Sequence, residues 1–508
     1  MKARPFLIFL TVYLLIMIIP NIVGIYSADS NMEYSGLLLN PIDGYSYYAK
    51  MHQGREGHWS FLLPYSPENN GTAFLFIFYL TMGHISRILH VSIQFVFNAT
   101  RIIGATFLLL CLNLFLKRYW KGNIRYSWLV MTWLAYAGGL GFILLPFGIT
   151  TSDFWVTEAF PFLSSLSNPH FPIGLGLMLF LLSNDLRSNY RWSHAILMGL
   201  CGLGIAIIMP FNLVIAGVIE FFGIIWIYLE ERILYWRNFL ATFLLGFIFL
   251  LYQYFVILND PILVQWNNQN ITQTSPLWDV ILSFSPAFIL AGLWLVFIRK
   301  KPLNYYQKIV ILWFAVSLIL SILPINLQRR FLSGYSIPTG ILALSLINDL
   351  RERAFLWVNR LAGFSLSISL ITPALVYIIL IVGLCSNNSW LYIEKGETEA
   401  FQWINSHTRE NTVILASPET GAILPAYTHA KVIYGHPFES IDAHNRYHAV
   451  TDFYSNEIFS GNKSFSSIDI NYVWYGNRER KIGFPNWLNG RTAIYHQNGV
   501  YIYSWETE

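Results

Sequence analysis

The sequence is poor in charge. Asp, Glu, Lys and Arg make up 12% of its 508 residues, whereas 55% are hydrophobic and 17% are aromatic. A soluble protein usually carries about 25% charged residues, because its surface must be hydrated. The low charge excludes a chain that is water-soluble throughout. The apolar residues fall into blocks of about 17 to 25, long enough to cross a hydrocarbon core about 30 Å thick.

Cysteines and nucleotide-binding motifs are also scarce or missing. The three cysteines, Cys111, Cys201 and Cys385, provide no disulfide framework. The sequence contains no Walker loop and no dinucleotide fingerprint, so we expect no nucleotide cofactor. We also expect no nucleic-acid partner.

The apolar blocks predict a mainly α-helical, multi-pass membrane protein with about eleven transmembrane helices. The first block follows Met1-Lys2-Ala3-Arg4 and lacks a small-x-small cleavage site, which indicates a retained span rather than a signal peptide. The predicted spans lie near residues 5–27, 96–116, 126–148, 169–184, 193–209, 211–229, 238–258, 277–298, 305–323, 331–348 and 362–385.

Lys and Arg predict the orientation, because they accumulate in short cytoplasmic segments. Of the 23 Lys and Arg before residue 386, 17 fall in one alternating set of segments. The N-terminus is therefore predicted to be cytoplasmic and the C-terminal tail extracytoplasmic. The 17 cations are Lys2, Arg4, Lys117, Arg118, Lys121, Arg125, Arg187, Arg191, Arg232, Arg237, Arg299, Lys300, Lys301, Lys308, Arg351, Arg353 and Arg360. The six against the trend are Lys50, Arg55, Arg87, Arg101, Arg329 and Arg330.

One apolar segment, Thr72 to His90, does not fit this alternation as a span. Counting it would place the cations at 117–125 outside. It is also interrupted by His84, Arg87 and His90. We therefore predict a helix that lies at the outer membrane interface.

The composition changes at Ser386. Residues 386–508 carry 9 Lys and Arg against 13 Asp and Glu, whereas residues 1–385 carry 23 against 15. This shift predicts a transmembrane domain over 1–385, with outer loops at 28–71 and 149–168, and an extracytoplasmic α/β domain over 386–508. Helical spacing favours a helix over 397–407, and Asn498-Gly499 is a strong hairpin signal. Strands are predicted at 412–416, 431–434, 472–475, 492–496 and 500–503.

The first outer loop contains Asn40-Pro-Ile-Asp-Gly-Tyr-Ser-Tyr-Tyr-Ala-Lys-Met-His-Gln-Gly-Arg-Glu-Gly-His-Trp59. A hydrated loop with Tyr and Trp in the interfacial belt explains this composition equally well. An Asp soon after the first span, followed by a Tyr- and Ala-rich helix ending in Gly-x-Trp, resembles the C-type (GT-C) superfamily of polyprenyl-phosphate-sugar-dependent membrane glycosyltransferases. The chain looks like a bacterial or archaeal member. The segments 72–90, Asn98-Ala-Thr-Arg-Ile102 and Gly435-His-Pro-Phe-Glu439 are similar to its juxtamembrane helix, second span and outer domain.

The resemblance implies transfer of a sugar from a lipid-linked donor, within the membrane lipids, to a glycan, lipid or protein acceptor on the outer side. A single displacement at the anomeric carbon would invert its configuration. We predict that Asp43 is the general base, because its loop follows the first span at the outer face.

The second outer loop offers Asp153 and Glu158 as further catalytic candidates, and His170 closes the loop. The resemblance implies that an acid in this loop holds a divalent cation beside the first-loop Asp. Asp43 and Asp153 are therefore candidate ligands of Mg²⁺ or Mn²⁺, which prefer carboxylate oxygens. Many members carry two adjacent acids in the first loop, but here Gly44 follows Asp43. A capped, hydrated loop with a satisfied His is the structural alternative.

Two arginines, Arg329 and Arg330, open a predicted span from the outer side, where cations are disfavoured. The guanidinium group binds phosphate oxygens bidentately and stays charged, so we predict that this pair binds the donor phosphate. Arg101 and His170 are further candidates for that role. The alternative is a pair of anchors that reach ordinary lipid headgroups. In the tail, His436 and Glu439 are predicted to form a rim over the acceptor site.

Two other functions stay open. Glu220 lies in the middle of the predicted span 211–229, where a carboxylate is costly and a functional or paired role is expected. It is the best support for a transporter or flippase, although a hydrogen-bonded structural Glu also explains it. The second is a non-catalytic envelope assembly protein whose outer domain binds a partner.

Reporter fusions test the orientation. Fusions after Lys121, Lys300 and Arg353 should report cytoplasm, and fusions after Ser66, Gln269 and Gly461 should report the outside, because 17 of the 23 cations fall on one side. A cytoplasmic signal at Ser66 would contradict the interfacial placement of 72–90.

Overall fold

The computed structural model describes residues 3–121, 127–297, 302–352, 357–456, 465 and 468–505. The chain packs as two compact units. Unit 1 comprises Met1–Pro20, Ala99–Leu251 and Thr272–Val382, and unit 2 comprises Asn21–Asn98, Tyr252–Ile271 and Gly383–Glu508. The first outer loop therefore belongs to the same unit as the tail.

Seven positions used in the orientation prediction lie outside the described residues: Lys2, Arg125, Arg299, Lys300, Lys301, Arg353 and Gly461.

The apolar blocks form helices, as expected from their length. Among the described residues, seven helical segments are long and apolar enough to cross a membrane, or eight if the bent pair α13 and α14 counts as one span. The mainly helical, multi-pass character is confirmed. The long segments are α1 (Ala3–Ser27), α4 (Ile93–Tyr119), α10 (Pro210–Glu231), α11 (Trp236–Asn259), α15 (Tyr305–Ile322), η4 (Gln328–Leu332) with α16 (Ser336–Glu352), and α17 (Val358–Ser369) with α18 (Ile371–Cys385); the bent pair is α13 (Leu277–Phe284) and α14 (Ala287–Phe297).

The number of spans stays a prediction, because three of the eleven expected segments form shorter helices. Segments 169–184 and 193–209 form α8 (His170–Leu182) and α9 (Trp192–Ile208). Segment 126–148 is helical only over α5 (Ser127–Tyr136), after which short turns lead to α6 (Ser152–Trp155) and α7 (Pro161–Leu166). Gly139 lies at this break, where a Cβ atom would stand 2.0 Å from the Ser283 carbonyl oxygen.

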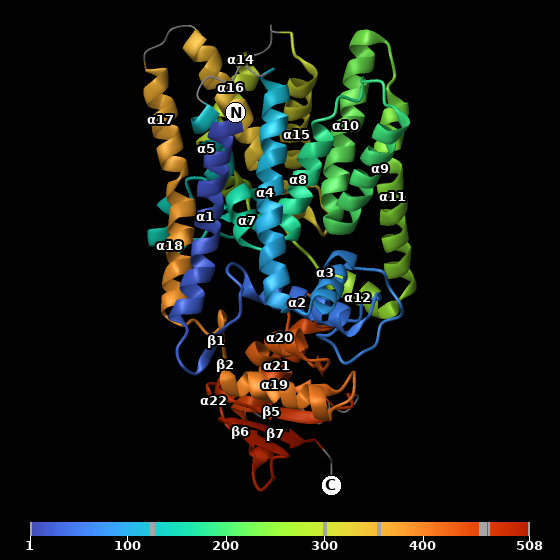
Figure 1. Cartoon of the computed structure of the whole chain (residues 1–508), viewed down its shortest axis with the longest axis vertical. Coiled ribbons are helices and arrows are strands. Elements are labelled where there is room, and N and C mark those ends of the chain that lie inside the picture. The colour runs from blue at the N-terminus through green and yellow to red at the C-terminus, as the bar shows by residue number, and fades with distance from the viewer. Residues whose placement is uncertain are drawn as a thin grey trace. The chain divides into compact units, whose positions relative to one another are not determined.

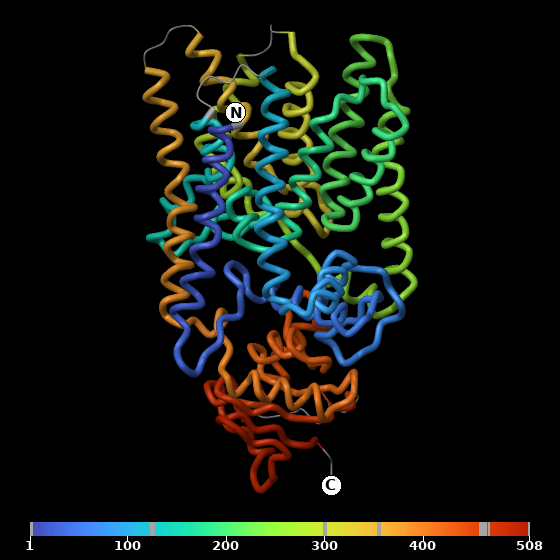
Figure 2. Tube along the Cα trace, in the orientation of Figure 1, coloured from blue at the N-terminus to red at the C-terminus, as the bar shows by residue number. Residues whose placement is uncertain are grey.

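Glycines bring the helices of unit 1 close together. Figures 1 and 2 show α9, α10 and α11 side by side. A Cβ atom on Gly202 of α9 would lie 2.2 Å from the Thr242 carbonyl oxygen of α11, and one on Gly246 would lie 2.8 Å from the Gly202 carbonyl oxygen. Small residues at these positions let the backbones approach, which is how apolar helices gain contact energy in a membrane.

In unit 2, the first outer loop contains two packed helices, α2 (Pro41–Glu56) and α3 (Ile77–Leu89). They meet at Gly54 and Gly83, where a Cβ atom would lie 2.1 Å and 2.0 Å from a carbonyl oxygen of the other helix. The 13 residues of α3 are too few to cross a bilayer, since about 20 are needed. Segment 72–90 therefore does not form a span, as predicted, and its place at the interface stays a prediction.

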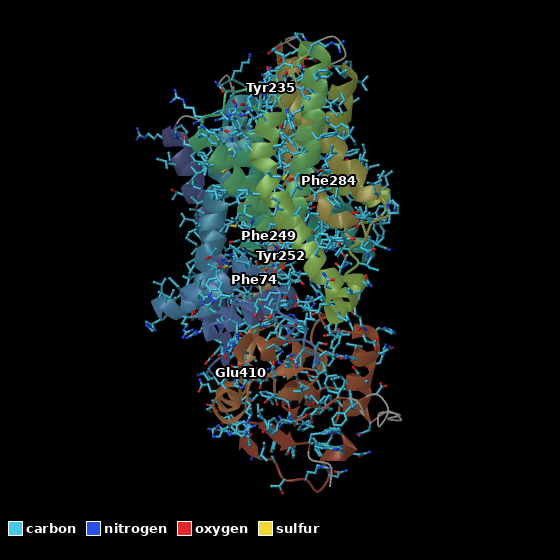
Figure 3. The ribbon with its side chains drawn as sticks, turned by 90° about the vertical axis from the view of Figure 1, so that its right-hand side faces the viewer. Phe74, Tyr235, Phe249, Tyr252, Phe284 and Glu410 are labelled. Atoms are coloured by element: carbon cyan, nitrogen blue, oxygen red, sulfur yellow. The ribbon has the colours of Figure 1, made fainter. Side chains whose placement is uncertain are left out.

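The loop between α2 and α3 is tied to the end of α11 and to α12 (Pro261–Gln269). The backbone N–H of Phe74 donates to the Tyr252 hydroxyl at 3.1 Å, and both residues are labelled in Figure 3. The Asp260 carboxylate, which caps α12, also accepts from the Gly71 N–H at 2.5 Å. These bonds fix the loop from the side of α12.

The tail has the predicted α/β character. Five of its described strands form one sheet in the order β4-β3-β5-β7-β6, with β3 parallel to β4 and β5, and with β7 antiparallel to β5 and β6. Asn498 and Gly499 have φ values of 46° and 81°, as a tight hairpin turn between β6 and β7 requires. The strands are β3 (Val413–Leu415), β4 (Lys431–Val432), β5 (Tyr472–Tyr475), β6 (Tyr495–Gln497) and β7 (Val500–Ser504), with helices α19 (Lys395–His407), α20 (Pro418–Tyr427), α21 (Ala443–Ser455) and α22 (Asn477–Arg480).

Strand pairing and helix packing join the first loop to the tail within unit 2. Strand β1 (Met32–Tyr34) pairs antiparallel with β2 (Tyr392–Glu394), and α2 packs on α20. Figure 1 shows β1 beside β2. Unit 2 is thus built from segments that are far apart in the sequence, and the candidate site lies where they meet.

Candidate active site

Helix α2 carries three polar residues on one face. Asp43, Ser46 and Lys50 are spaced by three and four residues, which places them in line along the helix. Asn40 precedes the helix with a φ of 51°, a conformation that Asn tolerates, and its side-chain amide donates to Asp43. Asp43 lies in the first turn, where a negative charge is favoured by the helix dipole.

The tail segment Gly435 to Ser440 meets this face of α2. His436 Nε2 lies 3.0 Å from Asp43 Oδ1. Glu439 Oε1 accepts from the Lys50 ammonium and from the Ser46 hydroxyl, each at 2.7 Å. Together with Asn40, these five residues form what we call the Asp43 cluster.

The ion pair between Lys50 and Glu439 is buried. The Lys50 side chain is 0% exposed, and its ammonium lies 4.4 Å from the centre of the Phe76 ring. Burial by itself would raise the pKa of the Glu439 carboxyl, but the adjacent Lys50 ammonium, aided by His436 and the hydrogen bonds, holds that pKa below its ordinary value. Lys50 was one of six cations against the orientation trend, and this pairing provides the reason for its position.

The segment that carries His436 is held on several sides. The Ser440 hydroxyl accepts from the N–H groups of Gly435 and His436, both at 3.1 Å. Gln269 of α12 donates to the carbonyl oxygens of Phe438 at 3.2 Å and Ser440 at 2.5 Å. A Cβ atom on Gly435 would lie 2.2 Å from the Gly421 carbonyl oxygen, so only glycine fits there.

His436 and Glu439 were predicted to form a rim over the acceptor site. Both are buried, with residue exposures of 3% and 7%. The side chain of Asp43 is 28% exposed and is thus the more accessible member of the cluster. The geometry favours Asp43 as the group that meets a ligand and the two tail residues as its support.

Asp153 of the second outer loop is buried in unit 1 and hydrogen-bonded through both oxygens. Oδ2 accepts from the N–H groups of Gly139 and Gly141, each at 3.1 Å, and Oδ1 accepts from the Thr151 hydroxyl at 2.6 Å and the Ser283 hydroxyl at 3.3 Å. Burial raises its pKa. This environment favours a structural role, because the carboxylate organises the turn that follows α5.

The predicted Mg²⁺ or Mn²⁺ site of Asp43 and Asp153 stays a prediction. The two residues belong to different units. Among the described residues, no group of three or more His, Cys, Asp or Glu side chains is arranged to hold a metal ion. The hydrogen bonds to both Asp153 oxygens also leave little capacity to bind a cation. The reaction proposed for Asp43 therefore includes no step at a metal ion.

Glu158 pairs with the two predicted phosphate-binding arginines. Its Oε1 lies 3.7 Å from Arg329 Nε and 3.5 Å from Arg330 Nη1, and the residue is 3% exposed. Arg329 lies over the Trp155 ring at 4.9 Å, and Arg330 lies 5.7 Å from the centre of the Phe211 ring. We call these five residues the Glu158 cluster. Two guanidinium groups and one carboxylate give it a net positive charge.

The remaining candidates have buried environments in unit 1. Arg101 of α4 donates to the Leu166 carbonyl oxygen at 3.1 Å. His170 begins α8 with its ring centre 4.0 Å from that of Phe171. Their predicted part in donor binding stays a prediction. Glu220 is buried and accepts from the Tyr305 hydroxyl at 2.7 Å, which fits the hydrogen-bonded structural alternative.

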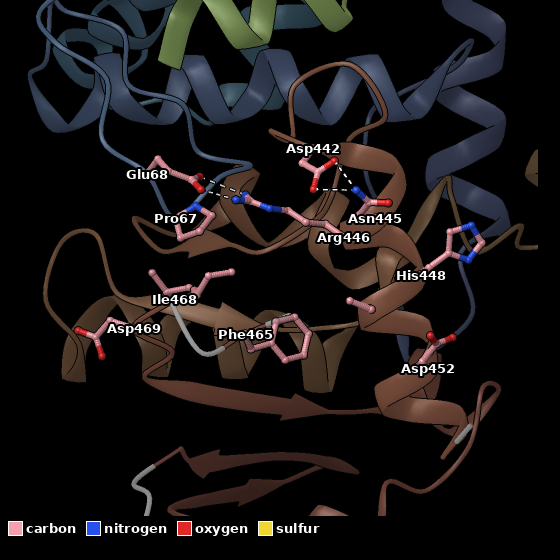
Figure 4. A pocket seen from close by; sticks show the side chains of 12 residues that line it. Pro67, Glu68, Asp442, Asn445, Arg446, His448, Asp452, Phe465, Ile468 and Asp469 are labelled. Atoms are coloured by element: carbon pink, nitrogen blue, oxygen red, sulfur yellow. Dashed lines mark hydrogen bonds and ion pairs between the residues drawn. The ribbon is translucent and has the colours of Figure 1, made fainter. Parts of the chain in front are cut away.

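Figure 4 shows a separate pocket of about 660 Å³ in unit 2. Glu68 and Arg446 form an ion pair on its wall, and Asp442 accepts from the Asn445 amide. Asp43 and His436 are not among the residues that line it. The Asp43 cluster is thus distinct from this pocket.

Sequence reasoning identified Asp43, His436 and Glu439 but missed Asn40, Ser46 and Lys50. The helical spacing of Asp43, Ser46 and Lys50 was visible in the sequence, and Lys50 stood out as a cation on the outer side. No local pattern indicated that the tail segment would lie along this face of α2.

No family model matches the sequence, and no curated protein matches it. The solved structures that are similar to the chain include two from Archaeoglobus fulgidus. One is the archaeal oligosaccharyltransferase AglB from Archaeoglobus fulgidus in complex with an inhibitory peptide and a dolichol-phosphate, with a TM-score of 0.48 and 13% identity over 91% of this chain and 69% of that chain. The other is an Archaeoglobus fulgidus oligosaccharyltransferase in complex with Zn and sulfate, with a TM-score of 0.46 and 15% identity over 90% of this chain and 67% of that chain.

Proposed function

We propose that the chain is a membrane glycosyltransferase that moves a sugar from a polyprenyl-phosphate donor to an acceptor on the outer side of the membrane. The observation that carries this proposal is the Asp43 cluster: a partly exposed carboxylate held by a buried His from the tail. A lipid-linked donor suits this arrangement because the sequence offers no nucleotide-binding motif.

Asp43 acts as the general base in this proposal. As the acceptor oxygen bonds to the anomeric carbon, its proton passes to the Asp43 carboxylate. The bond between the anomeric carbon and the phosphate oxygen breaks, and its electron pair leaves with the polyprenyl phosphate. This single displacement inverts the anomeric configuration. Proton removal by a positioned carboxylate contributes about 10² to 10⁴ in rate.

Arg329 and Arg330 hold the donor phosphate. Leaving-group departure builds negative charge on the phosphate oxygens, and fixed guanidinium groups stabilise that charge without reorganisation. The aromatic rings of Trp155 and Phe211 beside the two guanidinium groups support their orientation. A glycan, a lipid or a protein is the acceptor class, and its hydroxyl group supplies the proton that Asp43 removes.

The Asp43→Asn variant tests the base. Asn keeps the size and accepts the same hydrogen bond from His436, but it does not take up a proton, so turnover should fall by about 10² to 10⁴ while donor binding persists. Asp43→Glu shifts the oxygens by one methylene and should also be slow. The measurement is transfer of labelled sugar by the purified protein. Asp29→Asn, at an exposed position of unit 2, is the matched control and should keep normal turnover. Near-normal turnover by a well-folded Asp43→Asn protein would exclude this role.

The arginine pair is tested through donor dependence. Arg329→Ala or Arg330→Ala should raise the donor KM or lower donor affinity by about tenfold or more, because a charge-assisted bidentate contact is worth about 1.5 to 3 kcal/mol. Lys at either position should restore donor affinity only partly, since an ammonium group does not bind a phosphate bidentately as a guanidinium group does. Arg191→Ala, at an exposed arginine of unit 1, is the control. An unchanged donor KM in the double Ala variant would contradict phosphate binding and would support the alternative that both residues anchor to lipid headgroups.

A further inference from the structure

Both ring nitrogens of His436 are engaged within unit 2. The backbone N–H of Phe438 lies 3.1 Å from Nδ1, and Asp43 Oδ1 lies 3.0 Å from Nε2. A backbone amide only donates, so Nδ1 must be the acceptor and the ring proton lies on Nε2. The neutral ring therefore donates to the Asp43 carboxylate, in one fixed tautomer.

The ring has no room to turn away from Asp43. The hydrogen bonds of Ser440 and Gln269 hold the backbone before and after it, and His436 is 3% exposed. The Tyr65 ring packs beside it with centres 5.9 Å apart, while the Tyr65 hydroxyl donates to the Ala422 carbonyl oxygen at 3.0 Å. His436 thus presents a donor of fixed direction to a carboxylate that is itself partly exposed.

The Asp43 carboxylate is held at both oxygens, since Asn40 donates to Oδ2 and His436 donates to Oδ1. The buried ion pair of Lys50 and Glu439 lies on the same face of α2 and keeps the tail segment beside it. Hydrogen bonds at both oxygens fix the direction of the carboxylate, which a single bond would leave free to turn.

We propose that His436 is a positioning residue that aims the Asp43 carboxylate for the removal of the acceptor proton. The inference rests on the proposed function of Asp43. It assigns His436 a role behind the carboxylate instead of at the rim of the acceptor site. Because the bond joins the tail to the first outer loop, the competence of Asp43 depends on the tail being seated in unit 2.

The test compares His436→Leu, which removes the donor, with His436→Gln, whose amide N–H takes roughly the place of Nε2–H. For His436→Leu we expect kcat to fall by about 10-fold to 100-fold with the donor KM within about twofold, since misaimed catalytic groups are slow but still bind substrate. His436→Gln should recover part of kcat, because its amide N–H again donates to the Asp43 carboxylate.

The matched control is His496→Gln, at an exposed histidine of β6, which should leave kcat and the donor KM unchanged. Near-normal kcat per folded protein in His436→Leu would overturn the inference, and so would a fall in kcat that His436→Gln does not partly reverse. If His436→Leu fails to fold, a folded His436→Gln protein with kcat as low as that of Asp43→Asn would overturn it equally. Loss of activity in Asp43→Asn is independent of these outcomes, so failure of this inference and failure of the proposed base are distinguishable.

Discussion

The buried ion pair between Lys50 and Glu439 fixes the geometry on which the rest of unit 2 depends. Two desolvated charges are tolerated only when they pair, and removing one partner of such a pair costs about 3 to 5 kcal/mol. Lys50 lies two turns along α2 from Asp43, on the same face. Once Glu439 is bound to Lys50, the chain three residues earlier lies beside the start of α2, and His436 meets Asp43. The ion pair thus fixes how the tail segment is aligned along α2, and this alignment brings His436 within hydrogen-bond distance of Asp43.

The sequence predicted elements better than it predicted their pairing. Apolar blocks identified the helices, and Asn498-Gly499 identified the β6 to β7 hairpin, because both signals are local. The break after α5 was not visible in hydropathy, since it comes from backbone contacts at Gly139. The meeting of Asp43 with His436 joins residues 393 positions apart, and no period or spacing in the chain encodes such a contact.

The two acids of the second outer loop are both buried, but they have different partners, which the sequence does not show. Asp153 receives two backbone N–H groups and two hydroxyls, so its carboxylate completes a turn. Glu158, five residues later, faces Arg329 and Arg330 instead. Sequence reasoning made both residues catalytic candidates, and Asp153 a candidate metal ligand as well, because a sequence does not show which groups a side chain contacts. In the proposed reaction Asp43 alone is the base, and the Glu158 cluster supplies positive charge.

The most direct test of this account is the product formed by the purified full-length protein from a labelled polyprenyl-phosphate sugar and a pool of glycan, lipid and peptide acceptors. The account predicts transfer of the label with release of polyprenyl phosphate, and a product whose anomeric configuration is opposite to that of the donor. A product with retained configuration would contradict the single displacement. Movement of the intact labelled donor across liposomes without any transfer would contradict the enzyme and support the transporter.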